Sequence, residues 1–115
     1  QYIRADFEQL HFTGGYDHNY VLGRPGERKI MANAYCEESG IAMEAATDCC
    51  GVQFYAGNFI GEQTGKGGAA YHDRSAFCLE SQFYPNAVNE PDFPSPVVKA
   101  GHTYHTETSY RFYLR

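Results

Sequence analysis

Apolar and polar residues alternate along much of the chain, with the period of two that is typical of β-strands. In segment 29–36, for example, Ile30, Ala32 and Ala34 are expected on one face of a strand. The same alternation, or a short apolar run bounded by turn residues, predicts strands at 20–22, 29–36, 41–47, 52–55, 76–81 and 103–114. No stretch of about a dozen residues keeps the 3.6-residue period of an amphipathic helix. An all-β chain is therefore predicted.

Glycine and proline mark the connections between these strands. Residues 23–26 predict a turn, and the polar stretch 37–40 predicts a hairpin loop. The glycine-rich stretch 61–68 lacks the spacing of a phosphate-binding P-loop and is interpreted as a flexible surface loop. Residues 83–96 hold four of the five prolines and predict an irregular, extended crossing. Many short strands separated by turns predict an antiparallel β-sandwich.

The composition narrows the possible function classes. Hydrophobic residues make up 43% of the 115-residue chain and charged residues 20%, as in ordinary soluble domains. The formal net charge of -5 argues against nucleic acid and anionic membranes as partners. Ten tyrosines and eight phenylalanines suit strands and also surfaces that pack against sugar rings. For most of these rings, a place in the core is the simpler interpretation.

The apolar runs and the N-terminus predict no membrane segment. No run is long enough to cross a bilayer, and no signal peptide is visible. Because the chain opens with Gln1 rather than Met, we expect a processed chain or a piece of a longer protein. A cytoplasmic location is expected.

The cysteines and histidines indicate neither a disulfide framework nor a metal site. The four cysteines are Cys36, Cys49, Cys50 and Cys78. None of their spacings is of the metal-binding type, and without secretory signals we expect reduced, partly buried thiols. His102 and His105 lie in a segment predicted to be a strand, where residues three apart do not share a face.

Four segments carry the most specific signal in the sequence. They are GGYDHNYVL at 14–22, GVQFYAGNF at 51–59, FCLESQ at 77–82 and PNAVNEPDFPSP at 85–96. In their order and spacing these segments resemble the aldose 1-epimerase (galactose mutarotase) family, and the resemblance covers almost the whole chain. It implies a galactose mutarotase-like β-sandwich, of which residues 1–115 form the C-terminal part of a single domain.

Chains of this family are much longer, and the resemblance implies that the N-terminal part supplies the acid histidine. An N-terminal segment of the same enzyme is therefore an expected partner, either as a second chain or as a part absent from this sequence. The sequence departs from the family pattern at Cys49 and Cys50, where a polar residue and Pro are usual, at Ser81, where Thr is commoner, and at 99–102. None of these departures falls on a residue expected in catalysis.

The activity that the resemblance implies is mutarotation, the interconversion of the α and β anomers of free hexoses such as galactose and glucose. One group takes the proton from the anomeric hydroxyl and another gives a proton to the ring oxygen, so that the ring opens and recloses. A paired acid and base suffices for this chemistry. The expected ligand is a monosaccharide, and neither a cofactor nor a metal is expected.

Glu80 is the candidate catalytic base. It follows the apolar stretch 77–79, and a carboxylate that leaves such a stretch is expected to be partly desolvated, which suits it to proton transfer. The resemblance assigns the base to the glutamate of the L-E-[TP]-Q motif, which is Glu80 here. From the residues alone, a strand-end glutamate held in a salt bridge is the stronger interpretation, and the motif reverses that order.

Asp17, Gln53 and Tyr55 are the candidate substrate-binding residues. The Asp17 carboxylate accepts hydrogen bonds, which sugar hydroxyls donate, although Asp17 could instead cap a turn. Gln53 lies mid-strand between apolar neighbours and needs partners, and the resemblance makes both residues substrate ligands. Tyr55 shares the face of Gln53 and is expected in the pocket wall. Three further polar residues of the matched segments are interpreted as structural: His18, Asn58 and Gln82.

Two other interpretations stay open. A relative that acts on a sugar phosphate would need clustered arginines. The six arginines are scattered at Arg4, Arg24, Arg28, Arg74, Arg111 and Arg115. A non-catalytic carbohydrate-binding module on the same scaffold is the second alternative. The complete motif around Glu80 counts against it, and polarimetry on the complete protein would separate binding from catalysis.

Overall fold

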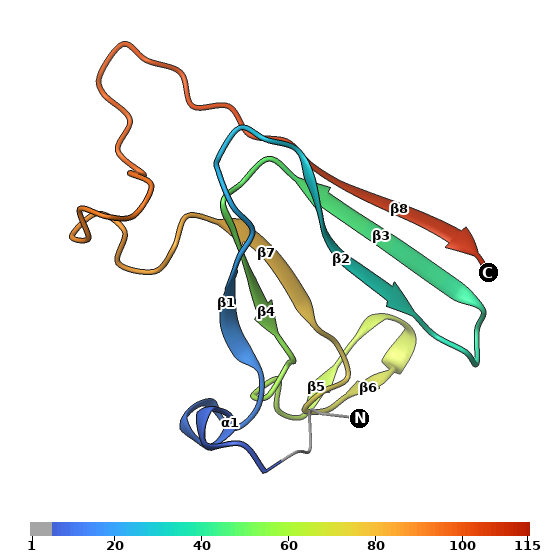
Figure 1. Cartoon of the computed structure of the whole chain (residues 1–115). Helices are drawn as coiled ribbons and strands as arrows, with labels where there is room; N and C mark the ends of the chain where they lie inside the picture. Colours follow the sequence, from blue (N-terminus) through green and yellow to red (C-terminus); the bar gives the residue numbers. More distant parts are fainter. Residues whose placement is uncertain (1–5) are drawn as a thin grey trace. The chain divides into compact units, whose positions relative to one another are not determined.

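The computed structural model describes residues 6–115 (Figure 1), and Arg4 lies outside them. Short strands make up most of the regular structure. In chain order the elements are α1 (Glu8–Thr13), β1 (Asp17–Val21), β2 (Lys29–Tyr35), β3 (Ile41–Thr47), β4 (Gly51–Tyr55), β5 (Gln63–Thr64), the 3₁₀ turn η1 (Lys66–Gly68), β6 (Ala70–Tyr71), β7 (Cys78–Gln82) and β8 (Thr108–Leu114). This content confirms the predicted all-β class.

The described strands form three sheets. The first sheet has the order β1-β4-β7, the second has the order β2-β3-β8, and β5 pairs with β6 in a two-stranded hairpin. The first sheet joins three segments that lie about thirty residues apart along the chain. Its assembly therefore depends on long-range contacts rather than on local hairpins.

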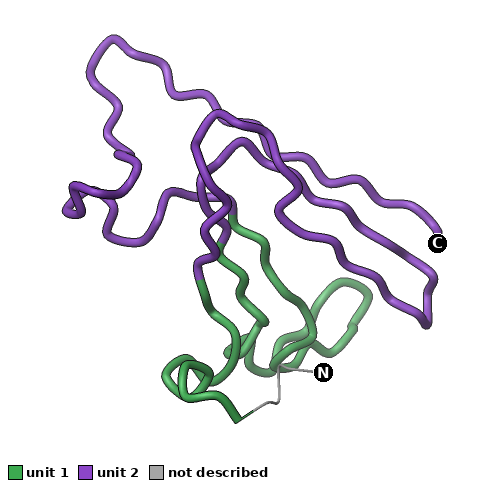
Figure 2. The backbone as a smooth tube through the Cα atoms, viewed as in Figure 1, with its two compact units in different colours: residues 1–18, 53–80 green, residues 19–52, 81–115 purple. Residues whose placement is uncertain are grey.

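Residue contacts divide the chain into two compact units, coloured separately in Figure 2. In the described chain, unit 1 comprises residues 6–18 and Gln53–Glu80, and unit 2 comprises Asn19–Val52 and Ser81–Arg115. The chain passes from one unit to the other inside each of β1, β4 and β7. All four candidate site residues belong to unit 1.

A β-bulge interrupts the pairing of β2 with β3 in the second sheet. Ile30 lies opposite Ala46, whereas Ala32 lies opposite Ala45, so the register shifts between them. The extra residue turns Ile30 to the other face of the sheet. The expected common face for Ile30 and Ala32 is therefore wrong, because strict alternation does not survive a bulge.

One face of the second sheet has a buried end and an exposed apolar end. β3 and β8 pair antiparallel along their whole length, with Ile41 opposite Leu114 and Met43 opposite Phe112. Thr47, at the far end of β3, is fully buried, whereas Phe112 and Leu114 are 66% and 81% exposed. Exposed apolar side chains in such a row are typical of a face that packs against another polypeptide segment.

Two elements in unit 1 differ from the sequence-based prediction. The helix α1 is too short to show a helical period, and it ends at Gly14, whose left-handed φ of 64° favours glycine. The stretch 61–68, predicted as a flexible loop, contributes to the hairpin in which Gln63 lies opposite Tyr71. The Tyr71 ring covers Gly65 so closely that a side chain there would overlap it, which explains the glycine at this turn.

The last strand begins later than predicted, at Thr108 rather than at residue 103. The Glu107 N–H donates to the Asp48 carboxylate at 2.9 Å, and the Glu107 carbonyl accepts from the Asp48 N–H at 3.2 Å. Because the Glu107 N–H bonds a side-chain carboxylate instead of a backbone carbonyl, regular pairing with β3 begins at Thr108. The segment between β7 and β8 contains neither helix nor strand, which confirms the predicted irregular crossing.

Candidate active site

The first sheet has an aromatic face within unit 1. The ring of Tyr16, which precedes β1, packs on Phe54 of β4 with centroids 5.6 Å apart. Phe54 in turn meets Phe77, which precedes β7, at 6.1 Å, and Tyr16 meets His18 of β1 edge-on at 5.6 Å. Because side chains alternate along extended backbone, these contacts place all four rings on one face.

The opposite face is polar. Each candidate site residue lies one or three positions from an aromatic residue of its own segment, so alternation turns it away from the rings. The residues that share this polar face are Asp17 of β1, Gln53 and Tyr55 of β4, and Glu80 of β7. Three strands that are far apart in sequence thus present the predicted base and the predicted ligands on the same side.

A direct hydrogen bond joins two of these residues. Nε2 of Gln53 donates to Oδ1 of Asp17 at 2.7 Å, and both side chains are half-buried. An ionised carboxylate has about four acceptor positions, so this bond orients the Asp17 carboxylate without exhausting its capacity. The pair is suited to meeting adjacent hydroxyl groups of a ligand.

Asn58 supports the chain just before Asp17. It is 5% exposed, and its Nδ2 donates to the carbonyl oxygens of Thr13 at 3.3 Å and Tyr16 at 3.0 Å. Its amide lies against Gly15, where any side chain would overlap it, and the φ of 147° at Gly15 also favours glycine. Asn58 is therefore structural, as predicted, and its contacts fix the entry to β1.

The Tyr55 hydroxyl accepts a hydrogen bond from the Phe59 N–H at 2.9 Å. This bond, together with half-burial of the ring, holds Tyr55 in place beside the Asp17–Gln53 pair on the polar face. A ring that is anchored through its own hydroxyl acts as a fixed surface. Such a position suits the wall of a pocket.

Glu80 is exposed in the described chain, so the expected partial desolvation is not present there. β7 is the edge strand in the order β1-β4-β7, and a carboxylate on an open face of an edge strand stays in water. None of the ion pairs among residues 6–115 involves Glu80. The alternative of a strand-end glutamate held in a salt bridge therefore has no support from these contacts.

His18 and Gln82 have structural contacts, as predicted. Nδ1 of His18 accepts a hydrogen bond from the Asp17 N–H at 3.0 Å. His18 also lies on the aromatic face, away from Glu80. In unit 2, Nε2 of Gln82 donates to Oδ1 of Asn19 at 3.1 Å.

All four cysteines are free thiols, with Cys49 and Cys50 buried and Cys36 and Cys78 exposed. The expected partial burial therefore holds only for the adjacent pair. Within residues 6–115, no three His, Cys, Asp or Glu side chains gather to hold a metal ion. Nor does any helix of this range have the length and apolar character to span a bilayer.

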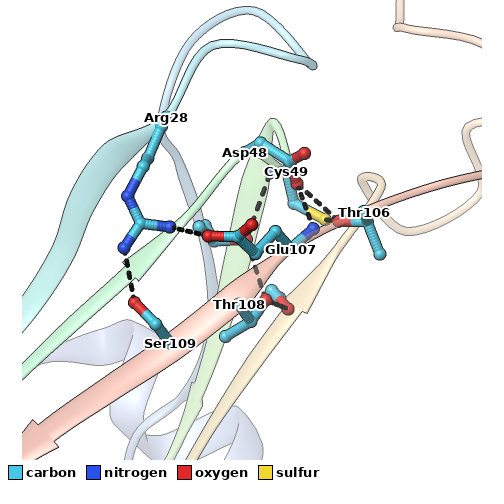
Figure 3. Close-up of polar contacts among 9 residues, drawn as sticks. Arg28, Asp48, Cys49, Thr106, Glu107, Thr108 and Ser109 are labelled. Atoms are coloured by element: carbon cyan, nitrogen blue, oxygen red, sulfur yellow. Dashed lines mark hydrogen bonds and ion pairs between the residues drawn. The ribbon is translucent and has the colours of Figure 1, made fainter.

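A second polar cluster lies in unit 2, where the β3–β4 turn meets the start of β8 (Figure 3). Oδ1 of Asp48 accepts from the Thr106 hydroxyl at 2.6 Å and from the Glu107 N–H at 2.9 Å. These bonds, the hydroxyl first, hold the pKa of the Asp48 carboxyl below its usual range. Since the Thr106 proton goes to Asp48, the Cys49 thiol donates to Thr106 Oγ1 at 3.1 Å. Arg28 completes the cluster through Glu107 at 2.6 Å.

This cluster has no counterpart in the sequence-based predictions. Its residues come from the segments 28, 48–49 and 106–109, and no motif links them. The pairing of β3 with both of its neighbours, β2 and β8, brings them together. Its contacts tie the end of one strand to the start of another, which is a structural role.

The fold and the polar face together define an all-β protein that presents carboxylate, amide and phenol groups on one side of a sheet. The family model described as aldose 1-epimerase matches residues 2–111 of the chain. The chain therefore belongs to the aldose 1-epimerase family, and the resemblance carried by the four sequence segments is confirmed.

Individual relatives agree with this assignment. The chain is 42% identical over 106 residues to galactose mutarotase of Sus scrofa, covering 91% of this chain and 31% of that protein. It is 33% identical over 101 residues to aldose 1-epimerase of Escherichia coli K12, covering 85% and 29%. A solved aldose epimerase homologue from C. elegans superimposes with a TM-score of 0.70 at 28% identity, covering 85% of this chain and 30% of that one. The chain thus spans about a third of the length of the relatives it matches.

Proposed function

We propose that the complete protein containing this chain is an aldose 1-epimerase that interconverts the α and β anomers of free hexoses such as galactose and glucose. The observation that carries the proposal is the polar face of the first sheet, where Gln53 donates to Asp17 at 2.7 Å and Glu80 lies on the same side. The names of the relatives support the reaction class.

In the proposed reaction, the Glu80 carboxylate takes the proton from the anomeric hydroxyl while an acid protonates the ring oxygen. The bond between the anomeric carbon and the ring oxygen breaks, which leaves an aldehyde and a free hydroxyl. Rotation about the adjacent carbon–carbon bond presents the other face of the aldehyde, and the reverse proton transfers close the ring. Asp17 and Gln53 hold sugar hydroxyls during this turnover, and Tyr55 forms part of the wall.

The proposal includes an N-terminal segment of the same enzyme as partner, with residues 1–115 as the C-terminal part of one domain. That segment would supply the acid and cover Glu80, which is exposed here. The exposed row of Ile41, Phe112 and Leu114 supports such a partner, because it offers an apolar face to pack against. The net charge of -5 and the free thiols support a cytoplasmic enzyme without nucleic acid or membrane partners.

The test is polarimetry on the complete protein with freshly dissolved α-D-glucose and α-D-galactose. Glu80→Gln keeps the shape of the side chain but cannot accept the proton, so we expect kcat to fall by about 10²–10⁴-fold. The acidic limb of the pH–rate profile should disappear as well, and KM should change far less. Thermal unfolding measured in parallel reports any loss of folded protein.

Glu62→Gln is the matched control. Glu62 is also exposed and lies in unit 1, where it pairs with His72 at 2.7 Å, and its loss should leave the rate unchanged. A stable Glu80→Gln protein with full activity would contradict the catalytic assignment. Sugar binding without any acceleration by the wild type would instead favour a non-catalytic carbohydrate-binding module.

A further inference from the structure

A chain of hydroxyl groups runs from the interior of unit 2 to the residue after Glu80. The Cys49 N–H donates to Oγ1 of Thr47 at 3.1 Å. Oγ1 of Thr47 lies 3.0 Å from Oγ1 of Thr108, its partner in the register of β3 with β8. Oγ1 of Thr108 lies 2.7 Å from Oγ of Ser81 in β7. The chain therefore connects the second sheet to β7.

The direction of the first bond between hydroxyls in this chain follows from burial. Thr47 is fully buried, and among residues 6–115 the acceptor within reach of its hydroxyl proton is Thr108. A buried hydroxyl proton needs an acceptor, so Thr47 donates to Thr108. The half-buried Thr108 hydroxyl is also bonded to Ser81, and either oxygen can be the donor of that bond. Thr108 thus bridges the buried Thr47 and Ser81 of β7.

We propose that Ser81 is a positioning residue for Glu80, held by Thr108 from the second sheet. The two residues are neighbours in β7, and their side chains point to opposite faces. β7 is an edge strand with β4 as its neighbour in the first sheet. The hydroxyl chain therefore restrains β7 from the face opposite to the carboxylate, and this sets the position of the Glu80 backbone. The inference rests on the proposed function, since it assigns Ser81 a role through Glu80.

The test uses the complete protein and compares Ser81→Ala with Ser81→Thr. Removing the hydroxyl should lower kcat by about 10-fold and change KM little. A displacement of about 1 Å typically lowers the rate by roughly 10²-fold, and the loss of one restraint should displace Glu80 by less than that. Ser81→Thr keeps a hydroxyl within reach of Thr108 and should recover the rate. Ser109→Ala is the control, because it removes a half-buried serine hydroxyl that bonds Arg28 at 2.6 Å instead of the chain, and its rate should match the wild type.

The double variant Glu80→Gln with Ser81→Ala separates positioning from general stability. If Ser81 acts through Glu80, its loss should cost no further rate once Glu80 is glutamine. Equal fold-losses in both backgrounds, or a Ser81→Ala rate at the wild-type level, would overturn the inference while Glu80→Gln still lowers kcat. Full activity of Glu80→Gln would instead contradict the proposed function itself. Thr108→Val, which removes the same bond from the other side, should reproduce the kcat loss of Ser81→Ala.

Discussion

The two three-stranded sheets of this chain differ in how they are assembled and in what they carry. The second sheet contains the local β2–β3 pair and the pairing of β3 with β8, which keeps register along the whole length of both strands. The first sheet joins β1, β4 and β7 from distant parts of the sequence. Its strands are shorter, and its polar face carries every candidate site residue.

This difference indicates that the second sheet contributes mainly to folding stability and that the first sheet carries the groups available for ligand binding and catalysis. The second sheet has fully buried residues such as Ala45 and Thr47, which contribute to folding through packing and satisfied hydrogen bonds. The first sheet presents half-buried or exposed polar groups such as Gln53 and Glu80, which contribute little to packing and are available to a ligand. Substitutions on the polar face of the first sheet should therefore affect ligand binding and kinetics, and those of buried residues in the second sheet should mainly affect stability. Thr108 is the exception, because it bonds Ser81 of β7.

After Glu80→Gln, the largest effect is expected from Asp17→Ala on the first sheet. In the proposed site it removes a charged acceptor for sugar hydroxyls, and it leaves Gln53 without its 2.7 Å bond. Hydrogen bonds to charged groups contribute roughly 1.5–3 kcal/mol, so sugar Kd should rise about 10- to 100-fold in calorimetric titration of the complete protein. Gln53→Ala should cost less, and the double variant should cost less than the sum, because the two side chains act as a pair.

Asp92→Ala, at an exposed position of the irregular crossing, is the control and should leave binding intact. If Asp17→Ala bound the sugar with the Kd of the wild type, Asp17 would not be a ligand. The polar face of the first sheet would then lose its main difference from the second sheet. If the binding losses of Asp17→Ala and Gln53→Ala simply added up in the double variant, both residues would still be ligands. They would then not act as a pair.

The next effect is expected from Thr47→Val on the second sheet. Valine keeps the shape but cannot bond the Cys49 N–H at 3.1 Å or Thr108 at 3.0 Å. A buried polar group left without its partner costs roughly 1–3 kcal/mol, so urea unfolding should show a loss of that size. Thr103→Val, at an exposed threonine, should cost nothing measurable. Equal stability of the two variants would show that the hydroxyl chain does not stabilise the second sheet.

The sequence predicted the second sheet better than the first. Segment 41–47 was bounded correctly, because turn residues flank it on both sides, but the bulge beside Ile30 leaves no such trace in the sequence. Alternation predicted the β4 segment, yet it did not predict that β4 lies between β1 and β7. The matched motifs, rather than periodicity, pointed to Asp17 and Glu80. The exposure of Glu80 was missed because sequence does not show which faces remain open.

Asp48→Asn should have a smaller effect that depends on pH. The Thr106 hydroxyl and the Glu107 N–H hold the pKa of Asp48 below its usual value. A lowered folded-state pKa stabilises the fold above the unfolded value of about 3.9, and the contribution disappears as pH falls through the lower folded value. The Tm difference between wild type and variant should therefore be largest near neutral pH and vanish in strong acid. A difference that stays constant from neutral to strongly acidic pH would show that Asp48 contributes shape rather than charge.

The smallest effect concerns the thiols that lie at the ends of the two sheets. Cys36 follows β2 in an exposed turn, where the Ser39 hydroxyl and N–H lower its pKa, whereas burial raises the pKa of Cys50, next to β4. Thiolates are the reactive form, so iodoacetamide at neutral pH should alkylate Cys36 well before Cys50, as followed by peptide mass spectrometry. Ser39→Ala removes the hydroxyl and should slow alkylation of Cys36 without changing that of Cys78, which is also exposed. If Cys36 in Ser39→Ala reacted as fast as in the wild type, exposure alone would account for its reactivity. If Cys50 reacted first, the start of β4 would have to open in solution, and the first sheet would be less firmly held than its contacts indicate.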